Sequence, residues 1–132
     1  MRIVLDTNVL VSALLSPHGA PAQVVQLVLS GKLQLCHDAR SLDEYRQVLL
    51  RPKFAFRRRD VEELLGFLGS MGLAVNCIPV DSALPDVDDQ PFLEAAVAGG
   101  ADFLITGNLR HFPASLRSGI RVVAPAEFLQ VR

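Results

Sequence analysis

Short runs of aliphatic and β-branched residues recur along the chain, and polar or turn-forming residues bound each run. Runs of this length and composition predict buried strands. The expected strands cover residues 3–5, 33–37, 73–80, 103–106 and 121–123. The first of them starts next to the amino terminus, and its apolar run is broken at Asp6.

Apolar positions spaced three or four residues apart predict helices between these strands. Asp38 is a natural N-cap for the helix that follows the second strand, and Asp60 is expected to cap a later helix. Gly99-Gly100 is typical of a helix end. The expected helices cover residues 9–15, 24–29, 39–50, 61–71, 92–98 and 126–131.

The alternation of strands and helices indicates the fold class. A chain that alternates in this way is expected to form a parallel sheet with helices on both faces, which is an α/β fold. No repeat, low-complexity tract or linker interrupts the pattern. We therefore expect residues 1–132 to form a single domain.

The composition narrows the function classes. Half of the 132 residues are hydrophobic and the formal net charge is −1, which argues against a generally polycationic nucleic-acid binder. A chain of this size can fold without a metal, so any bound metal is expected to be functional. Cys36 and Cys77 lie in apolar runs and are expected to be buried free thiols, which suits a reducing cytoplasm. No apolar stretch reaches the roughly 20 residues that a membrane-spanning helix needs.

Carboxylates and other polar side chains follow several of the predicted elements. In open parallel sheets, ligands bind beyond the carboxyl ends of the strands, where such side chains can converge. A cluster of carboxylates either binds cations or takes up protons, and hard oxygen ligands suit Mg²⁺ or Mn²⁺. Each acid could instead be a helix cap or part of a solvated loop. The positions concerned are Asp6, Thr7 and Asn8 after the first strand, Asp43 and Glu44 in the helix after the second, Asp86, Asp88 and Asp89 before a later helix, and Thr106, Gly107 and Asn108 after the fourth strand.

Three segments resemble the motifs of the PIN-domain family. Residues 3–13 look like its opening motif, residues 41–54 resemble the helix that carries the second acid in one subgroup, and residues 86–108 are similar to its third and fourth motifs. The resemblance implies a three-layer α/β/α sandwich around a mainly parallel sheet of about four or five strands. It also implies a Mg²⁺- or Mn²⁺-dependent ribonuclease that hydrolyses RNA phosphodiester bonds.

The resembling subgroup is commonly described as the VapC-like toxin component of toxin–antitoxin pairs. We therefore expect an RNA substrate, an antitoxin protein and a second copy of the chain as partners. The cytoplasm is the expected compartment, because the first apolar run, broken at Asp6, reads as neither a signal peptide nor a membrane span.

The resemblance also assigns roles to single residues. Asp6, Glu44 and Asp89 match the catalytic, metal-binding acids of the family, and Asp86 is a neighbouring candidate for the metal. Many PIN domains carry an Asp where this chain has Asn108, which leaves open whether one or two ions bind. The side chains expected to orient ligands or water are Thr7, Asn8, Thr106 and Asn108.

A basic stretch lies between two predicted helices, with Phe54 and Phe56 interleaved among its charges. Its basic residues are Arg51, Lys53, Arg57, Arg58 and Arg59. Arg57, Arg58 and Arg59 could follow an RNA backbone while a ring stacks on a base. The stretch could equally be a solvated connector with the phenylalanines in the core. Arg110 and His111, just past Asn108, could contact a phosphate or have no special role.

Two other functions are compatible with parts of the pattern. One is a PIN-like binding module with impaired catalysis, because Asn108 removes a negative charge. The other is an aspartyl-phosphate phosphatase, which also places an Asp after a strand. That class expects a lysine near the phosphate, and the chain has only Lys32 and Lys53, neither suitably placed.

Overall fold

Five strands form one parallel sheet in the computed structural model, which describes all of residues 1–132. The strand order is β3-β2-β1-β4-β5, so that β1 lies at the centre. Every neighbouring pair of strands is parallel, which confirms the predicted sheet. The strands are β1 (Arg2–Leu5), β2 (Gln34–His37), β3 (Leu73–Ala74), β4 (Phe103–Ile105) and β5 (Val122–Val123).

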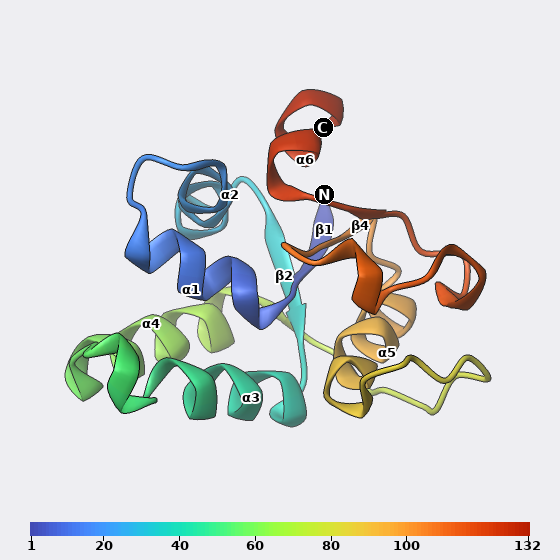
Figure 1. Ribbon diagram of the computed structural model, residues 1–132, viewed down its shortest axis with the longest axis horizontal. Coiled ribbons are helices and arrows are strands. Elements are labelled where there is room, and N and C mark those ends of the chain that lie inside the picture. The colour runs from blue at the N-terminus through green and yellow to red at the C-terminus, as the bar shows by residue number, and fades with distance from the viewer.

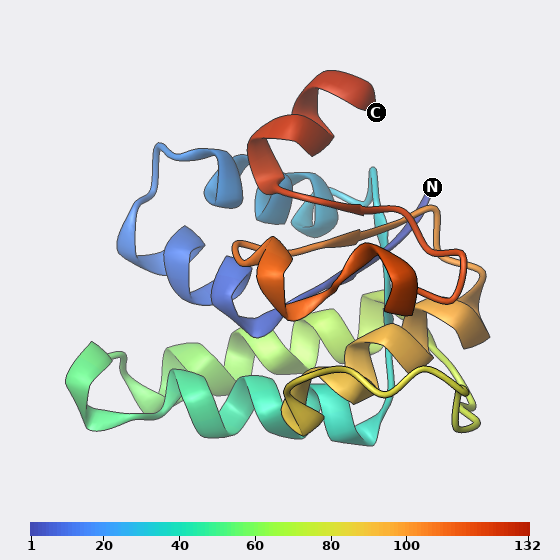
Figure 2. The same ribbon diagram turned by 45° about the vertical axis from the view of Figure 1, so that its right-hand side comes forward.

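Helices cover both faces of this sheet, as the α/β/α prediction requires. α5 packs against β1, β2 and β4, and Figure 1 shows it across the sheet from α1 and α2. α6 packs on α2, and α3 runs beside α4 (Figure 2). No helix has the length and apolar character needed to cross a bilayer. The helices are α1 (Thr7–Leu15), α2 (Ala20–Leu29), α3 (Ala39–Leu49), α4 (Arg58–Met71), α5 (Gln90–Gly99) and α6 (Pro125–Val131), with short 3₁₀ turns η1 (Pro52–Phe54), η2 (Val87–Asp89), η3 (Leu109–His111) and η4 (Ala114–Leu116).

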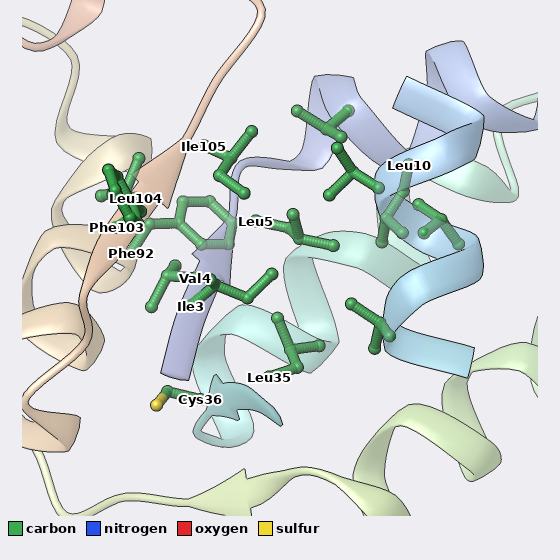
Figure 3. Close-up of a cluster of buried hydrophobic side chains, with 14 of the residues drawn as sticks. Ile3, Val4, Leu5, Leu10, Leu35, Cys36, Phe92, Phe103, Leu104 and Ile105 are labelled. Carbon is green, nitrogen blue, oxygen red and sulfur yellow. The ribbon is translucent and has the colours of Figure 1, made fainter. Parts of the chain in front are cut away.

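The central strand is the middle of the hydrophobic core. Ile3, Val4 and Leu5 are completely buried, because α5 packs on one face of the sheet and α1 and α2 lie on the other (Figure 1). A strand buried on both faces needs an unbroken apolar run rather than an alternating one. Figure 3 shows these side chains among those of Leu10 and Phe92.

The order of the strands places a crevice beside β1. The chain adds β2 and then β3 on one side of β1, and then returns through α5 to form β4 on the other side. This reversal makes the gap beyond the carboxyl ends of β1 and β4 the topological switch point, where α/β proteins bind ligands. Leu5 pairs with Ile105 across the two strands, so Asp6 and Thr106 emerge side by side at that point.

The third strand is shorter than predicted. The sequence indicated residues 73–80, but only Leu73–Ala74 is a strand. One further hydrogen bond follows, from Val75 N–H to His37 O at 2.9 Å. β3 is an edge strand whose only neighbour, β2, ends at His37, so the residues after it have no strand to pair with.

Other local predictions were wrong as well. Asp60 does not cap α4: the N-cap position is Arg57, and Asp60 lies in the first turn, where a negative charge still favours a helix. Cys77 is only partly buried, because it follows the short third strand, whereas Cys36 is buried inside the sheet as expected. α1 begins at Thr7, two residues earlier than its apolar pattern suggested.

We predict that Tyr45→Phe lowers the free energy of unfolding by about 1–2 kcal/mol. Tyr45 is completely buried, and its hydroxyl donates to Leu5 O at 2.6 Å. Phenylalanine keeps the stacking on Phe92 but leaves this carbonyl without its side-chain donor. Urea denaturation measures the change, and an unaltered midpoint and slope would show that Leu5 O does not depend on the hydroxyl.

Candidate functional site

Asp6 is held at the end of the central strand by hydrogen bonds from two elements. Its backbone N–H donates to Ile105 O at 2.9 Å, which continues the pairing of β1 with β4. Its carboxylate accepts a hydrogen bond from Thr106 Oγ1 at 2.8 Å and another from Asn8 Nδ2 at 3.2 Å. Burial raises the pKa of Asp6, and the hydrogen bond from Thr106 offsets part of this rise.

The turn after β4 supports this arrangement from behind. Asn108 N–H donates to Thr106 Oγ1 at 3.0 Å, and Gly107 N–H donates to Asn8 Oδ1 at 2.8 Å. A Cβ at Gly107 would lie 3.2 Å from Asn8 Oδ1, so a larger residue there would push Asn8 away from Asp6. These bonds orient the Asp6 carboxylate without using all of its lone pairs.

Glu44 reaches the same region from α3. The helix begins with a capping box, in which Asp38 accepts from Ser41 N–H at 2.9 Å and Ser41 Oγ accepts from Asp38 N–H at 3.0 Å. Glu44 is half-buried, and burial, followed by the negative charge of Asp88, raises its pKa. The positive charge of Arg51 opposes this rise.

Asp89 enters the site at the start of α5. The η2 turn brings it there, stabilised by Asp88 N–H donating to Asp86 Oδ1 at 2.9 Å. Asp89 is buried, and burial together with the nearby charge of Asp6 raises its pKa to about 6, although His111 lowers it. Asp6 and Asp89 both precede a helix, and the positive end of each helix dipole favours a carboxylate there.

These elements enclose a cleft of about 370 Å³. The predicted residues that line it are Asp6, Thr7, Asn8, Glu44, Asp86 and Asp89, accompanied by Val11, Ser12, Val48, Arg51, Phe54, Asp88, Phe92 and His111. Carboxylates that are far apart in the sequence therefore share one cavity. Other candidates do not line it: Thr106 is buried behind Asp6, Asn108 acts through its backbone N–H, and Arg57, Arg58, Arg59 and Arg110 are exposed elsewhere.

His111 is the side chain at this site to which the sequence assigned no definite role. Its Nδ1 lies 2.8 Å from Asp89 Oδ2. One ligand atom each from Asp86, Asp89 and His111 lie within 4.8 Å of one another, a group to which neither Asp6 nor Glu44 belongs. In the sequence, the only hint that His111 belongs to the site was its position just beyond Asn108, after β4. That position did not indicate that η3 turns back toward α5.

The chain matches the family model described as PIN domain over residues 2–110. It belongs to the PIN-domain family. The matched residues include Asp6, Glu44 and Asp89, and they cover every strand of the sheet except β5.

Known proteins similar to this PIN domain share most of its length. An uncharacterized protein of Methanocaldococcus jannaschii is 26% identical over 98% of this chain and 90% of its own length. The VapBC2 structure from Rickettsia felis, bound to a DNA fragment from their promoter, has a TM-score of 0.60 at 14% identity, and the match covers 94% of this chain and 98% of that one. The FitAB structure bound to the IR36 DNA fragment has a TM-score of 0.61 at 18% identity, covering 93% and 94%. These likenesses support the fold of the PIN domain.

The cleft of this PIN domain has the features that a divalent cation requires. Its carboxylates repel one another and lose hydration on burial, so a bound cation would lower their free energy. Thr7 Oγ1 is buried in the cleft wall and has no hydrogen-bond partner. A hydroxyl of this kind could bind an ion or one of its waters, so the residues present fit a metal ion with oxygen ligands.

We predict that Asp89→Asn alters how stability depends on pH. A carboxyl group whose pKa is raised on folding stabilises the folded state when it is protonated. For Asp89 this stabilisation is complete below pH 3.8, its ordinary pKa, and is lost as the pH rises through about 6, its pKa in the folded protein. The amide of the variant does not titrate, so the variant loses no such stabilisation as the pH rises. Relative to wild type, metal-free Asp89→Asn should therefore gain on the order of 1 kcal/mol between pH 4 and pH 7.

Denaturant unfolding at the two pH values, with a chelator present, checks this expectation. Asp43→Asn is the matched control, because the side chain of Asp43 is 61% exposed and does not line the cleft. An equal gain in both variants would mean that the buried position of Asp89 is not responsible.

Proposed function

We propose that this PIN domain is a metal-dependent endoribonuclease that hydrolyses RNA phosphodiester bonds with Mg²⁺ or Mn²⁺, and that Asp6, Glu44 and Asp89 are its catalytic acids. The observation that carries the proposal is the cleft at the switch point, where carboxylates from three elements line one cavity. A divalent ion in such a site activates water and stabilises the charge that develops on a phosphodiester.

The three acids would have different tasks in this reaction. Asp6 is oriented by Thr106 and Asn8, which makes it a fixed ligand for the ion. Asp89 would bind from the start of α5. Glu44 lies on the α3 side, and its raised pKa suits a group that helps to remove a proton from the attacking water.

One wall of the cleft is suited to the substrate. Arg51 and Phe54 line it, and they come from the connector between α3 and α4. Arg51 is exposed, and its charge already acts on Glu44, so it could bind a phosphate beside the reacting group. Phe54 is half-buried, and its ring centroid lies 5.6 Å from that of Phe56 and 5.1 Å from Lys53 Nζ. The part of the ring that lines the cleft could contact a base.

The basic residues proposed earlier to bind RNA are placed less favourably. Arg59 lies 3.6 Å from Glu63 on the exposed side of α4, and Arg57 lines a separate apolar pocket. We therefore propose Arg51 as the main substrate contact in this stretch. The other arginines would contribute only to the overall electrostatic attraction of RNA; they are Arg57, Arg58, Arg59 and Arg110.

We further propose that the protein is the toxin of a toxin–antitoxin pair in the cytoplasm, with an antitoxin protein and a second copy of the chain as partners. The sequence motifs and the similar folds of VapBC2 and FitAB support this proposal. An aspartyl-phosphate phosphatase has less support, because no lysine lines the cleft beside Asp6.

Asp6→Asn is expected to abolish metal-dependent RNA cleavage while the protein stays folded. The amide removes a negative ligand but keeps an oxygen that can accept the hydrogen bond from Thr106. Stability without metal should be unchanged or higher, because one charge leaves a mutually repelling group. Cleavage of a labelled single-stranded RNA with and without Mn²⁺ measures the effect.

Asp43→Asn is the matched control for that assay. Asp43 lies on α3 next to Glu44, but its side chain is 61% exposed and does not line the cleft. The control should cleave like wild type. Full activity in Asp6→Asn, purified identically, would refute the nuclease proposal, and loss of activity in both variants would point to a general effect of charge.

Arg51→Gln is expected to weaken the binding of a single-stranded RNA oligonucleotide and to reduce the salt dependence of log K by about 0.7 for one lost phosphate contact. Arg59→Gln is the control, since Arg59 is 88% exposed and outside the cleft. Fluorescence anisotropy over a salt series in the Asp6→Asn background separates binding from cleavage. Equal slopes for the two variants would contradict a substrate role for Arg51.

A further inference from the structure

The group formed by Asp86, Asp89 and His111 combines ligand atoms of two kinds. Asp86 and Asp89 lie at the two ends of the turn that leads into α5, and His111 ends the η3 turn after β4. One carboxylate oxygen from each acid and one imidazole nitrogen lie within 4.8 Å of one another. The group therefore joins two segments that are distant in the sequence, and it lies inside the cleft.

The contact between Asp89 and His111 is close but is not a well-formed hydrogen bond. Asp89 Oδ2 is buried and has no aligned hydrogen-bond donor, although His111 Nδ1 lies only 2.8 Å away. A buried anionic oxygen without a donor is unfavourable. Thr7 Oγ1, in the wall of the same cleft, is also buried and without a partner. These atoms would be satisfied by a cation and its bound water.

The spacing of the donor atoms fits the size of such an ion. An octahedral ion with ligands at about 2.1 Å has neighbouring ligand atoms about 3.0 Å apart and opposite ones about 4.2 Å apart. The separation of 2.8 Å between Asp89 and His111 is close to the first value. No two ligand atoms of the group are more than 4.8 Å apart, so the whole group has about the extent of such a coordination shell.

We propose that Asp86, Asp89 and His111 form a metal site whose imidazole ligand makes it prefer Mn²⁺ to Mg²⁺. Carboxylates alone bind both ions, whereas an imidazole nitrogen is a poor ligand for Mg²⁺ and a good one for transition-metal ions. His111 thus determines which divalent ion occupies this part of the cleft.

The site shares Asp89 with the proposed nuclease centre. The proposal rests on the nuclease function only for what the ion would do to RNA, because binding and ion preference need no substrate. Measurements on the protein without RNA therefore distinguish a failure of this proposal from a failure of the nuclease assignment.

Mn²⁺ bound to the full chain is examined by electron spin echo envelope modulation, which detects a directly bonded nitrogen. Wild type and His18→Gln should both show the nitrogen signal, because His18 is an exposed turn residue that does not line the cleft. His111→Gln should lose it. Persistence of the signal in His111→Gln, or its absence from wild type, would overturn the proposal.

Calorimetric titrations with MnCl₂ and MgCl₂ supply the second measurement. His111→Gln should weaken Mn²⁺ binding by about tenfold or more and Mg²⁺ binding by less than about threefold. His111→Asp supplies an oxygen ligand instead, so it should bind both ions and shift the ratio of affinities toward Mg²⁺. An unchanged Mn²⁺-to-Mg²⁺ ratio in both variants would show that His111 is not a ligand. If the nitrogen signal and the ratios behave as expected but no RNA is cleaved, only the nuclease assignment fails.

Discussion

The parallel pairing of β1 with β4 brings Leu5 beside Ile105, and the residues that follow these two meet beyond the ends of the strands. Asp6 is thereby buried next to Thr106, which donates to its carboxylate. This pair also places two neighbouring segments of the cleft, because α1 starts directly after Asp6 and the turn after β4 leads to η3. A slip of one residue would carry Asp6 into the position of the fully buried Leu5, and the cost of burying that charge in the core favours the observed register.

Burying carboxylates in one cleft opposes folding, and the structure compensates for this only in part. Hydrogen bonds to Asp6 and the amino ends of α1 and α5 favour the charged forms, yet the pKa values of Asp6, Glu44 and Asp89 are all raised. A bound cation would offset the electrostatic free energy that remains. A site that is unfavourable when empty and favourable when filled is what ion-dependent chemistry requires.

Acidic and basic side chains line different parts of the cleft, an arrangement that suits the proposed RNA substrate. Its acids lie at the switch point and along α3, whereas Arg51 lies on the connector that follows α3. An ion held by the acids and an arginine on the nearby wall would both attract phosphate, so a polyanion could bind although the protein has a net charge of −1. His111 adds an imidazole beside Asp89, where a ligand of another kind alters ion preference.

The sequence by itself determined the sheet and most helices, because buried strands need apolar runs and helix caps such as Asp38 act within a few residues. It also indicated which acidic residue follows each strand or begins each helix, because this depends only on the order of residues along the chain. It could not determine the length of β3, which depends on where its neighbour ends. Only the tertiary structure decided that Arg51 lines the cleft and that His111 lies against Asp89. Such contacts depend on how separate turns and helices pack, and no spacing within one segment encodes that.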